Sequence, residues 1–211
     1  MKKTKSVPLF PMFLKLTGRA CLVVGAGKIA QSKIRSLLIA GAIVRVIAPH
    51  ARKSVAEWAH AGVIQWEART FEPSHLDGVF LVIAATSSTA LNELVFREAG
   101  RRQILCNAVD DPEHCDFYFP AVMRRGQLQV AVSTGGRSPA LAQRLRRELE
   151  AQFSPQYAGW LEELGTTRDQ LRGSDVDPDE RRTLLHSLAS RKAFARRSSL
   201  VRTTTEIIHE R

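Results

Sequence analysis

The stretch CLVVGAGKIAQSKIRSLLIAGA, residues 21–42, decides which fold we expect for this chain. Its first four residues are apolar and predict a buried strand, which GAGKIA follows with the pattern G-x-G-x-x-A. Apolar side chains then recur at helical spacing until Gly41 supplies a stop. A strand, a glycine-rich turn and a helix in this order predict a dinucleotide-binding unit, with a pyrophosphate at the start of the helix.

The glycine-rich turn supplies the first candidate site residues. Gly25 permits the tight turn, Gly27 lets the backbone approach a pyrophosphate, and Ala30 lets the helix pack close to the strand. The residues expected to contact the cofactor at this turn are Gly25, Ala26, Gly27, Lys28 and Ile29. A tight turn without a ligand can have the same letters, so the interpretation depends on the strand and helix around the motif.

The remainder of the first half alternates between strand-like and helix-like segments. Strands are expected at 42–49, 63–68, 79–86 and 103–109, and helices at 54–62 and 90–100. This alternation predicts an α/β fold with a Rossmann-like, doubly wound parallel sheet. After Pro112 two strand-like runs surround Arg124-Arg125-Gly126, which predicts a β-hairpin, and the rest of the chain is expected to be helical from the cap at Ser138 onward.

Composition sets limits on the function. With 44% hydrophobic residues the chain can build a core, and it has no run of about 18 apolar residues that would predict a membrane span. The N-terminus is basic without a long apolar region, so we expect mature protein and not a signal peptide. Cys21, Cys106 and Cys115 lie in or beside apolar segments, which predicts reduced thiols in the cytoplasm. No cysteine or histidine spacing predicts a metal site.

The net charge of +10, from 31 basic and 21 acidic residues, leaves three interpretations open. The chain binds nucleic acid, or it binds an acidic small molecule, or its surface is simply basic and solvated.

The second expected strand ends in Ile47-Ala48-Pro49-His50, without the acidic residue that commonly holds the adenosine ribose. Backbone groups near Pro49 and His50 are candidates for that contact. Arg52 and Lys53 follow shortly after. Their side chains either bind a ribose 2′-phosphate or belong to the solvated start of a helix. These residues alone leave NAD and NADP open.

Two further segments place polar residues where ligands bind in such sheets. Thr86 lies in AATSS, whose small residues leave room for a cofactor at a strand end, although an ordinary capped turn has the same composition. Asn107 and Asp110 follow the last expected strand; a carboxylate there can transfer a proton, but Asp-Asp-Pro is also a turn signal, and spacing alone favours the turn.

A second glycine-rich loop opens the helix after the hairpin and is a candidate anion site or a flexible turn. Its candidate residues are Ser133, Thr134, Gly135, Gly136 and Arg137.

The ordered set of CLVVGAGKIAQSKIRSLLIAGA, VIAP, LVIAAT, CNAVDDPEHCDFYFPAV and QVAVSTGGRSPALAQRLRRELE resembles one known family. To about residue 195 the chain is similar to the precorrin-2 dehydrogenase/sirohydrochlorin ferrochelatase family, the dehydrogenase module of siroheme synthase. The most distinctive part is CNAVDD, then FPA, followed by VSTGGRSP.

This resemblance implies an enzyme of siroheme biosynthesis that oxidises precorrin-2 to sirohydrochlorin with NAD, and some members also insert Fe²⁺. It implies a homodimer with an NAD-binding Rossmann domain over 1–112, a central dimerisation region over 113–152 and a helical C-terminal domain over 153–211 with a basic tail. In this family the second strand often ends in Ala-Pro without an acidic residue, and NAD is still the cofactor. The resemblance therefore favours NAD over NADP here. It also makes Asp110 the catalytic aspartate and overturns the preference for a mere turn. The family's phosphorylated serine falls at Thr134, preceded by Ser133.

The implied partner is a polycarboxylate tetrapyrrole, which the +10 charge suits, with neither nucleic acid nor membrane as a partner. Three alternatives stay open: a dehydrogenase without chelatase activity, an NAD(P)-responsive regulatory protein that binds nucleic acid, and an NADP reductase of a small acid. The second would need a helix-turn-helix spacing that the sequence lacks, and the third leaves the loop at 133–137 unexplained.

Overall fold

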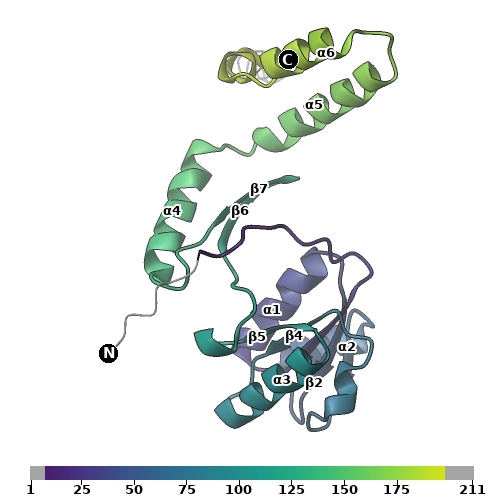
Figure 1. The fold of residues 1–211 in the computed structure, drawn as a ribbon, viewed down its shortest axis with the longest axis vertical. Coiled ribbons are helices and arrows are strands. Elements are labelled where there is room, and N and C mark those ends of the chain that lie inside the picture. The colour runs from purple at the N-terminus through teal and green to yellow at the C-terminus, as the bar shows by residue number, and fades with distance from the viewer. Residues whose placement is uncertain (1–7, 198–211) are drawn as a thin grey trace, which may run out of the picture. The chain divides into compact units, whose positions relative to one another are not determined.

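The computed structural model describes residues 8–197 (Figure 1). The chain folds into two compact units, and the boundary between them in the sequence lies between Phe119 and Pro120. The first unit is an α/β domain and the second is a hairpin with helices. The expected fold class is confirmed in both parts. Within the described range no helix is long and apolar enough to cross a membrane.

The first unit is built on a five-stranded parallel sheet in the order β3-β2-β1-β4-β5. The strands are β1 (Ala20–Val24), β2 (Ile43–Ile47), β3 (Gln65–Glu67), β4 (Leu81–Ala84) and β5 (Leu105–Ala108). The connecting helices are α1 (Lys28–Ile39), α2 (Lys53–His60), the short η1 (Pro73–Leu76) and α3 (Thr89–Arg101). Strands β2 to β5 are each shorter than the segments expected from the sequence, because residues at the ends of those segments belong to the loops.

Helices cover both faces of this sheet. Cys21 and Val23 of β1 belong to a core that also contains α1 and α2, whereas Leu22 and Val24 point to a second core that contains η1 and α3. Strands buried on both faces are expected to be apolar without alternation, and LVV in β1 has that composition.

The register of the sheet aligns the carboxyl ends of four strands. Val24 is paired with Ile47 on one side and with Ala84 on the other, and Ala84 is paired with Ala108. The loops that follow these four residues therefore begin side by side at one edge of the sheet. The chain turns to opposite sides of β1 to form β2 and β4, and this switch point is where ligands bind in open α/β sheets.

After β5 the chain does not form another crossover. A short helix η2 (Pro112–His114) reverses its direction, and Cys115 then forms an antiparallel bridge with Asn107. Phe117 and Phe119 pack against the core on the α1 face. The segment 113–119 thus belongs structurally with the sheet.

The second unit contains an antiparallel hairpin of β6 (Ala121–Arg125) and β7 (Leu128–Val132), followed by α4 (Pro139–Gln152), α5 (Tyr157–Arg172) and α6 (Pro178–Leu188). Side chains of Ser138 and Asp177 cap α4 and α6, as their positions before Pro139 and Pro178 lead one to expect.

The hairpin turn differs by one or two residues from the sequence expectation. We expected the turn at Arg124-Arg125-Gly126, but β6 continues through Arg125 and the turn is Gly126-Gln127. The Arg125 guanidinium donates to the carbonyls of Phe153 and Glu150 at 2.7 and 2.8 Å, and these contacts hold Arg125 in the strand. The division into three domains stays a prediction, and most of the expected basic tail lies outside the described residues.

Candidate functional site

The glycine-rich turn lies at the carboxyl edge of β1. Gly25 has φ +104°, and a Cβ atom there would lie 2.4 Å from the carbonyl oxygen of Ala85. Its N–H donates to the carbonyl of Ile47 at 2.8 Å. Gly25 is therefore required by the close approach of three loops, in addition to the tight turn that its φ angle allows.

Gly27 is different, because its surroundings are open. It is the N-cap of α1 with φ −78°, it provides no side-chain cap, and the first turn of α1 carries no acidic residue. A Cβ atom on Gly27 would meet nothing within 4 Å. Uncapped N–H groups and the positive end of a helix dipole, with free space in front of them, fit the pyrophosphate of a dinucleotide. Ala30 is fully buried and lets α1 pack against the sheet.

The loop after β2 lies beside this turn. The backbone N–H of Arg52 donates to the carbonyl of Ala26 at 3.2 Å, and Trp66 Nε1 donates to the carbonyl of Ala48 at 2.9 Å. Ala48 is buried, whereas Pro49 and His50 are exposed next to the glycine-rich turn. This position is compatible with backbone contacts from Pro49 and His50 to a ribose.

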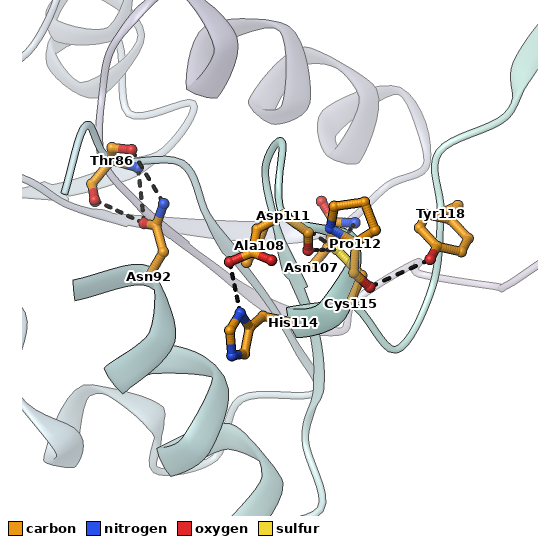
Figure 2. A network of polar contacts seen from close by, with 9 residues as sticks. All are labelled: Thr86, Asn92, Asn107, Ala108, Asp111, Pro112, His114, Cys115 and Tyr118. Atoms are coloured by element: carbon orange, nitrogen blue, oxygen red, sulfur yellow. Dashed lines mark hydrogen bonds and ion pairs between the residues drawn. The ribbon is translucent and has the colours of Figure 1, made fainter. Parts of the chain in front are cut away.

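The loop after β4 is held by a network between Thr86 and Asn92 of α3 (Figure 2). Asn92 Oδ1 accepts from the Thr86 hydroxyl at 2.8 Å and from the Thr86 N–H at 3.2 Å, and Asn92 Nδ2 donates to the Thr86 carbonyl. The hydroxyl also accepts from the N–H of Ser88. The hydrogen bonds of Thr86 with Asn92 and Ser88 thus fix the conformation of this loop. A contact between Thr86 and a cofactor would form in addition to these bonds.

Asn107 at the end of β5 is buried, with its amide turned to the returning segment (Figure 2). Its Nδ2 donates to the Phe117 carbonyl at 2.8 Å and contacts Cys115 Sγ at 3.2 Å. Cys115 Sγ in turn lies 3.0 and 3.1 Å from the carbonyl oxygens of Ala108 and Asp111, which share its one S–H donor. Asn107 therefore fixes the loop that carries Asp110, while its Oδ1 accepts no hydrogen bond from the described residues.

The two neighbouring aspartates have different environments. Asp111 is partly buried, and its carboxylate lies 2.6 Å from His114 Nδ1 (Figure 2). Asp110 is exposed, and its carboxylate forms no hydrogen bond or ion pair with the described residues. Its φ of +62° is uncommon for a residue other than glycine. A free carboxylate on a strained turn at the carboxyl edge of the sheet is available for proton transfer.

The structure adds Lys33, which the sequence analysis missed. Lys33 lies on α1, and its Nζ is 3.6 Å from the centre of the Phe119 ring. Burial lowers the pKa of the Lys33 ammonium, while the charges of Asp110 and Cys115 act in the opposite direction. Nothing in the sequence singles out Lys33, because Phe119 is 86 positions away and no pattern connects the two.

The remaining candidate residues belong to the second unit. The loop before α4 is ordered by its hydroxyls: Ser133 Oγ accepts from the N–H of Gly135 at 3.2 Å, and Thr134 Oγ1 accepts from the N–H of Ser138 at 3.1 Å. Gly135 and Gly136 have φ angles of +58° and +77°, and Arg137 is exposed.

Among the described residues, no group of three or more His, Cys, Asp or Glu side chains is arranged to hold a metal ion.

Comparisons with known proteins match both parts of the chain. A family model described as NAD(P)-binding matches residues 12–121, and the model "Sirohaem biosynthesis protein central" matches residues 125–152. The siroheme synthase of Photorhabdus laumondii subsp. laumondii is 39% identical over 173 residues, which cover 82% of this chain and 37% of that relative. The siroheme synthase of Neisseria meningitidis serogroup B is 44% identical over 173 residues, 82% of this chain and 36% of that relative.

A solved structure is similar over nearly the whole length of both proteins. SirC, precorrin-2 dehydrogenase, has a TM-score of 0.75 and 28% identity, with 87% of this chain and 91% of SirC covered. The chain spans little more than a third of the two siroheme synthases above. The chain therefore belongs to the family of the NAD(P)-binding model that matches residues 12–121, and the central domain of sirohaem biosynthesis proteins follows directly at residues 125–152.

Proposed function

We propose that this protein is an NAD-dependent precorrin-2 dehydrogenase that forms sirohydrochlorin. The observation that carries the proposal is the pairing, at one edge of the sheet, of an open and uncapped helix start at Gly27 with a free carboxylate at Asp110. The first suits the pyrophosphate of a dinucleotide and the second suits a proton transfer. The similarity to SirC, which covers 91% of that enzyme, supports the choice of substrate.

Residues of the first unit would hold the dinucleotide. Backbone groups from Gly25 to Ile29 would bind the pyrophosphate, and Pro49 and His50 would lie beside the adenosine ribose. NAD, when bound, supplies the acceptor for a hydride. No acidic residue directly follows Ala48 at the end of β2. Lys53 is 3.9 Å from Glu57, so the exposed Arg52 is the nearer candidate for contact with a 2′-phosphate. The comparison of NAD with NADP is therefore part of the test.

Asp110 would act as the base. Oxidation of precorrin-2 removes two hydrogens from carbon and nitrogen positions of the ring, one as hydride and one as a proton. Precorrin-2 and NAD⁺ thus give sirohydrochlorin, NADH and H⁺. A solvent-accessible carboxylate on a fixed turn can accept that proton and pass it to water. Asn107, Cys115 and their carbonyl partners keep the turn in place.

The loop of Ser133, Thr134, Gly135, Gly136 and Arg137 would bind carboxylates of the tetrapyrrole. The Arg137 side chain is exposed and forms no ion pair among the described residues, so its guanidinium is available to an anionic ligand. The net charge of +10 would attract a ligand of many carboxylates. The serine and threonine hydroxyls of this loop are also the positions to examine for phosphorylation.

We also infer a homodimer formed through the central region. Leu141 on α4 belongs to the apolar stripe of this helix and is 40% exposed. Light scattering of the full chain would give twice the monomer mass, and Leu141→Glu would lower that mass if the helix lies in the interface. The cysteines are all free, which fits a reducing compartment such as the cytoplasm.

Insertion of Fe²⁺ into sirohydrochlorin is a second proposed activity, favoured because the relatives are siroheme synthases. Iron enters as a substrate and displaces two pyrrole protons, for which Asp110 is the available acceptor. The macrocycle supplies the nitrogen ligands, so the reaction needs no protein metal cage.

The test is an anaerobic absorbance assay. Precorrin-2 is made in situ from uroporphyrinogen III and mixed with the full chain and NAD, NADP or neither nucleotide. We expect sirohydrochlorin to appear with NAD, more slowly with NADP and not without nucleotide. Fe²⁺ added afterwards tests chelation. If no spectral change occurs with either nucleotide, the proposed dehydrogenase function is wrong.

A further inference from the structure

Lys33 is a charged side chain near the candidate site to which the preceding paragraphs give no role in the reaction. It lies on α1 in the second turn of the helix, and it is half-buried between the helix and the segment that returns after β5. Its Nζ is 3.6 Å from the centre of the Phe119 ring, and Phe119 packs against Phe117 with ring centres 5.5 Å apart. The ammonium is thus held on an aromatic surface at the α1 face of the sheet.

The N–H donors of the Lys33 ammonium form no hydrogen bond with the described residues. A lysine ammonium carries three N–H donors and accepts nothing. Among the described residues Lys33 forms no hydrogen bond and no ion pair within 4.0 Å, although the charges of Asp110 and Cys115 are close enough to affect its pKa. Burial disfavours the charged form of Lys33 and lowers its pKa. Because no described residue forms a hydrogen bond or an ion pair with the ammonium, a bound anion would stabilise its charge.

The location separates Lys33 from the pyrophosphate site. Lys33 lies five positions after Lys28, the first residue of the helix, which is a rise of about 7.5 Å along the helix axis. Lys33 points to the side where the Asp110 turn and the returning segment lie. An anion on Lys33 would therefore be next to the proposed proton acceptor and away from the phosphates.

We propose that Lys33 is a substrate-binding residue whose ammonium takes a carboxylate side chain of the tetrapyrrole and so positions the ring against Asp110. This inference rests on the proposed function and names a contact within the same site. Phe119 forms the aromatic side of this contact, because its ring lies 3.6 Å from the Lys33 Nζ, and Phe117 packs against that ring. An Arg at position 33 would keep the charge but not the fit to the ring.

The experiment measures binding of sirohydrochlorin to the full chain by anaerobic absorbance titration, beside the KM for precorrin-2 and the Kd for NAD. The variants are Lys33→Met, which keeps the length of the side chain without its charge, and Lys33→Arg. Arg35→Met is the matched control, because Arg35 is an exposed cation on the same helix. Thermal unfolding of each variant shows that the fold is intact.

We expect Lys33→Met to weaken sirohydrochlorin binding and to raise the KM about tenfold, the usual effect of losing a charge-assisted hydrogen bond. Binding of NAD should stay within about twofold, Lys33→Arg should recover part of the loss, and Arg35→Met should behave as the wild type. Two results would overturn the proposal. One is an unchanged Kd for sirohydrochlorin in Lys33→Met. The other is a lower kcat with unchanged KM, which would make Lys33 a partner of Asp110. Because the titration needs no turnover, it tests Lys33 even if precorrin-2 is not oxidised.

Discussion

The side-chain amide of Asn107 donates to the backbone carbonyl of Phe117 at 2.8 Å and joins the last strand of the sheet to the segment that returns beside it. The same amide contacts Cys115 Sγ at 3.2 Å. Between these anchors lies the turn with Asp110, whose carboxylate is free and whose φ is +62°. A buried amide thus holds an exposed carboxylate in place.

Asn107→Ala should destabilise the protein and lower turnover together. The substitution leaves the Phe117 carbonyl without its buried donor, which costs about 1–3 kcal/mol of the free energy of unfolding. Urea unfolding measures this loss, and Gln127→Ala, in the exposed hairpin turn, should change it by less than about 0.5 kcal/mol. An unchanged stability for Asn107→Ala would show that the amide does not hold the turn.

Gly27→Asp should abolish NAD binding while the protein stays folded. Its φ of −78° is ordinary for any residue, and a Cβ atom there meets nothing within 4 Å, so the backbone accepts the change. The new carboxylate would occupy the space that we assign to the pyrophosphate and repel it. Titration with NAD measures the effect. Gly100→Ala in α3, which also has an open Cβ position, is the control and should bind NAD as the wild type does. If Gly27→Asp binds NAD normally, the assignment of the pyrophosphate to this helix start is wrong.

Asp110→Asn should lose turnover and keep NAD binding. Asparagine tolerates the left-handed backbone at this position, so the variant removes the charge without adding strain. Loss of a positioned base lowers rates by roughly 10²–10⁴-fold. Asp111→Asn is the matched neighbour, whose carboxylate is already engaged by His114, and it should retain most of the activity. The ratio of kcat between the two variants decides which aspartate transfers the proton, and equal losses would contradict the assignment to Asp110.

The stability of the protein should fall at alkaline pH because of its buried thiols. Burial raises the pKa of Cys21 from 9.0 to about 11 and that of Cys106 from 9.0 to about 12. Above pH 9 the unfolded chain releases protons that the folded chain keeps, so the free energy of unfolding decreases as pH rises, by up to about 1.4 kcal/mol per pH unit for each thiol. Well below pH 9, where both states keep the thiol protons, the two thiols contribute no slope.

Urea unfolding at pH 8, 9 and 10 tests this, with the Cys21→Ala/Cys106→Ala variant as the reference. The double variant should show the smaller slope between pH 9 and 10. Identical slopes would show that other groups cause the pH dependence.

Much of the fold could be predicted because local patterns determine it. The apolar runs, the glycine-rich turn and the helical spacing of α1 are each contained within a few residues, and together they predict a parallel sheet with its ligand edge. The caps Ser138 and Asp177 are equally local. The hairpin turn was displaced because the side chain of Arg125 binds carbonyls at the end of α4, which lie 25 and 28 residues away.

The site was harder to predict because its contacts are distant in sequence. The sequence placed Asn107 and Thr86 at the correct edge, but it did not show that their amide and hydroxyl are bonded to Phe117 and Asn92. The second reason for Gly25, the nearby carbonyl of Ala85, depends on the pairing of β1 with β4. Lys33 could not be identified at all, since its environment is made by the returning segment.

The stoichiometry of the reaction tests the central claim most directly. The full chain is incubated anaerobically with precorrin-2 and excess NAD, and NADH and sirohydrochlorin are quantified by chromatography at successive times. If NAD accepts the hydride, the wild type should form one NADH for each sirohydrochlorin. The Gly27→Asp variant, which should not bind NAD, should form neither product. Sirohydrochlorin that forms without NADH, or at the same rate in Gly27→Asp, would contradict the account.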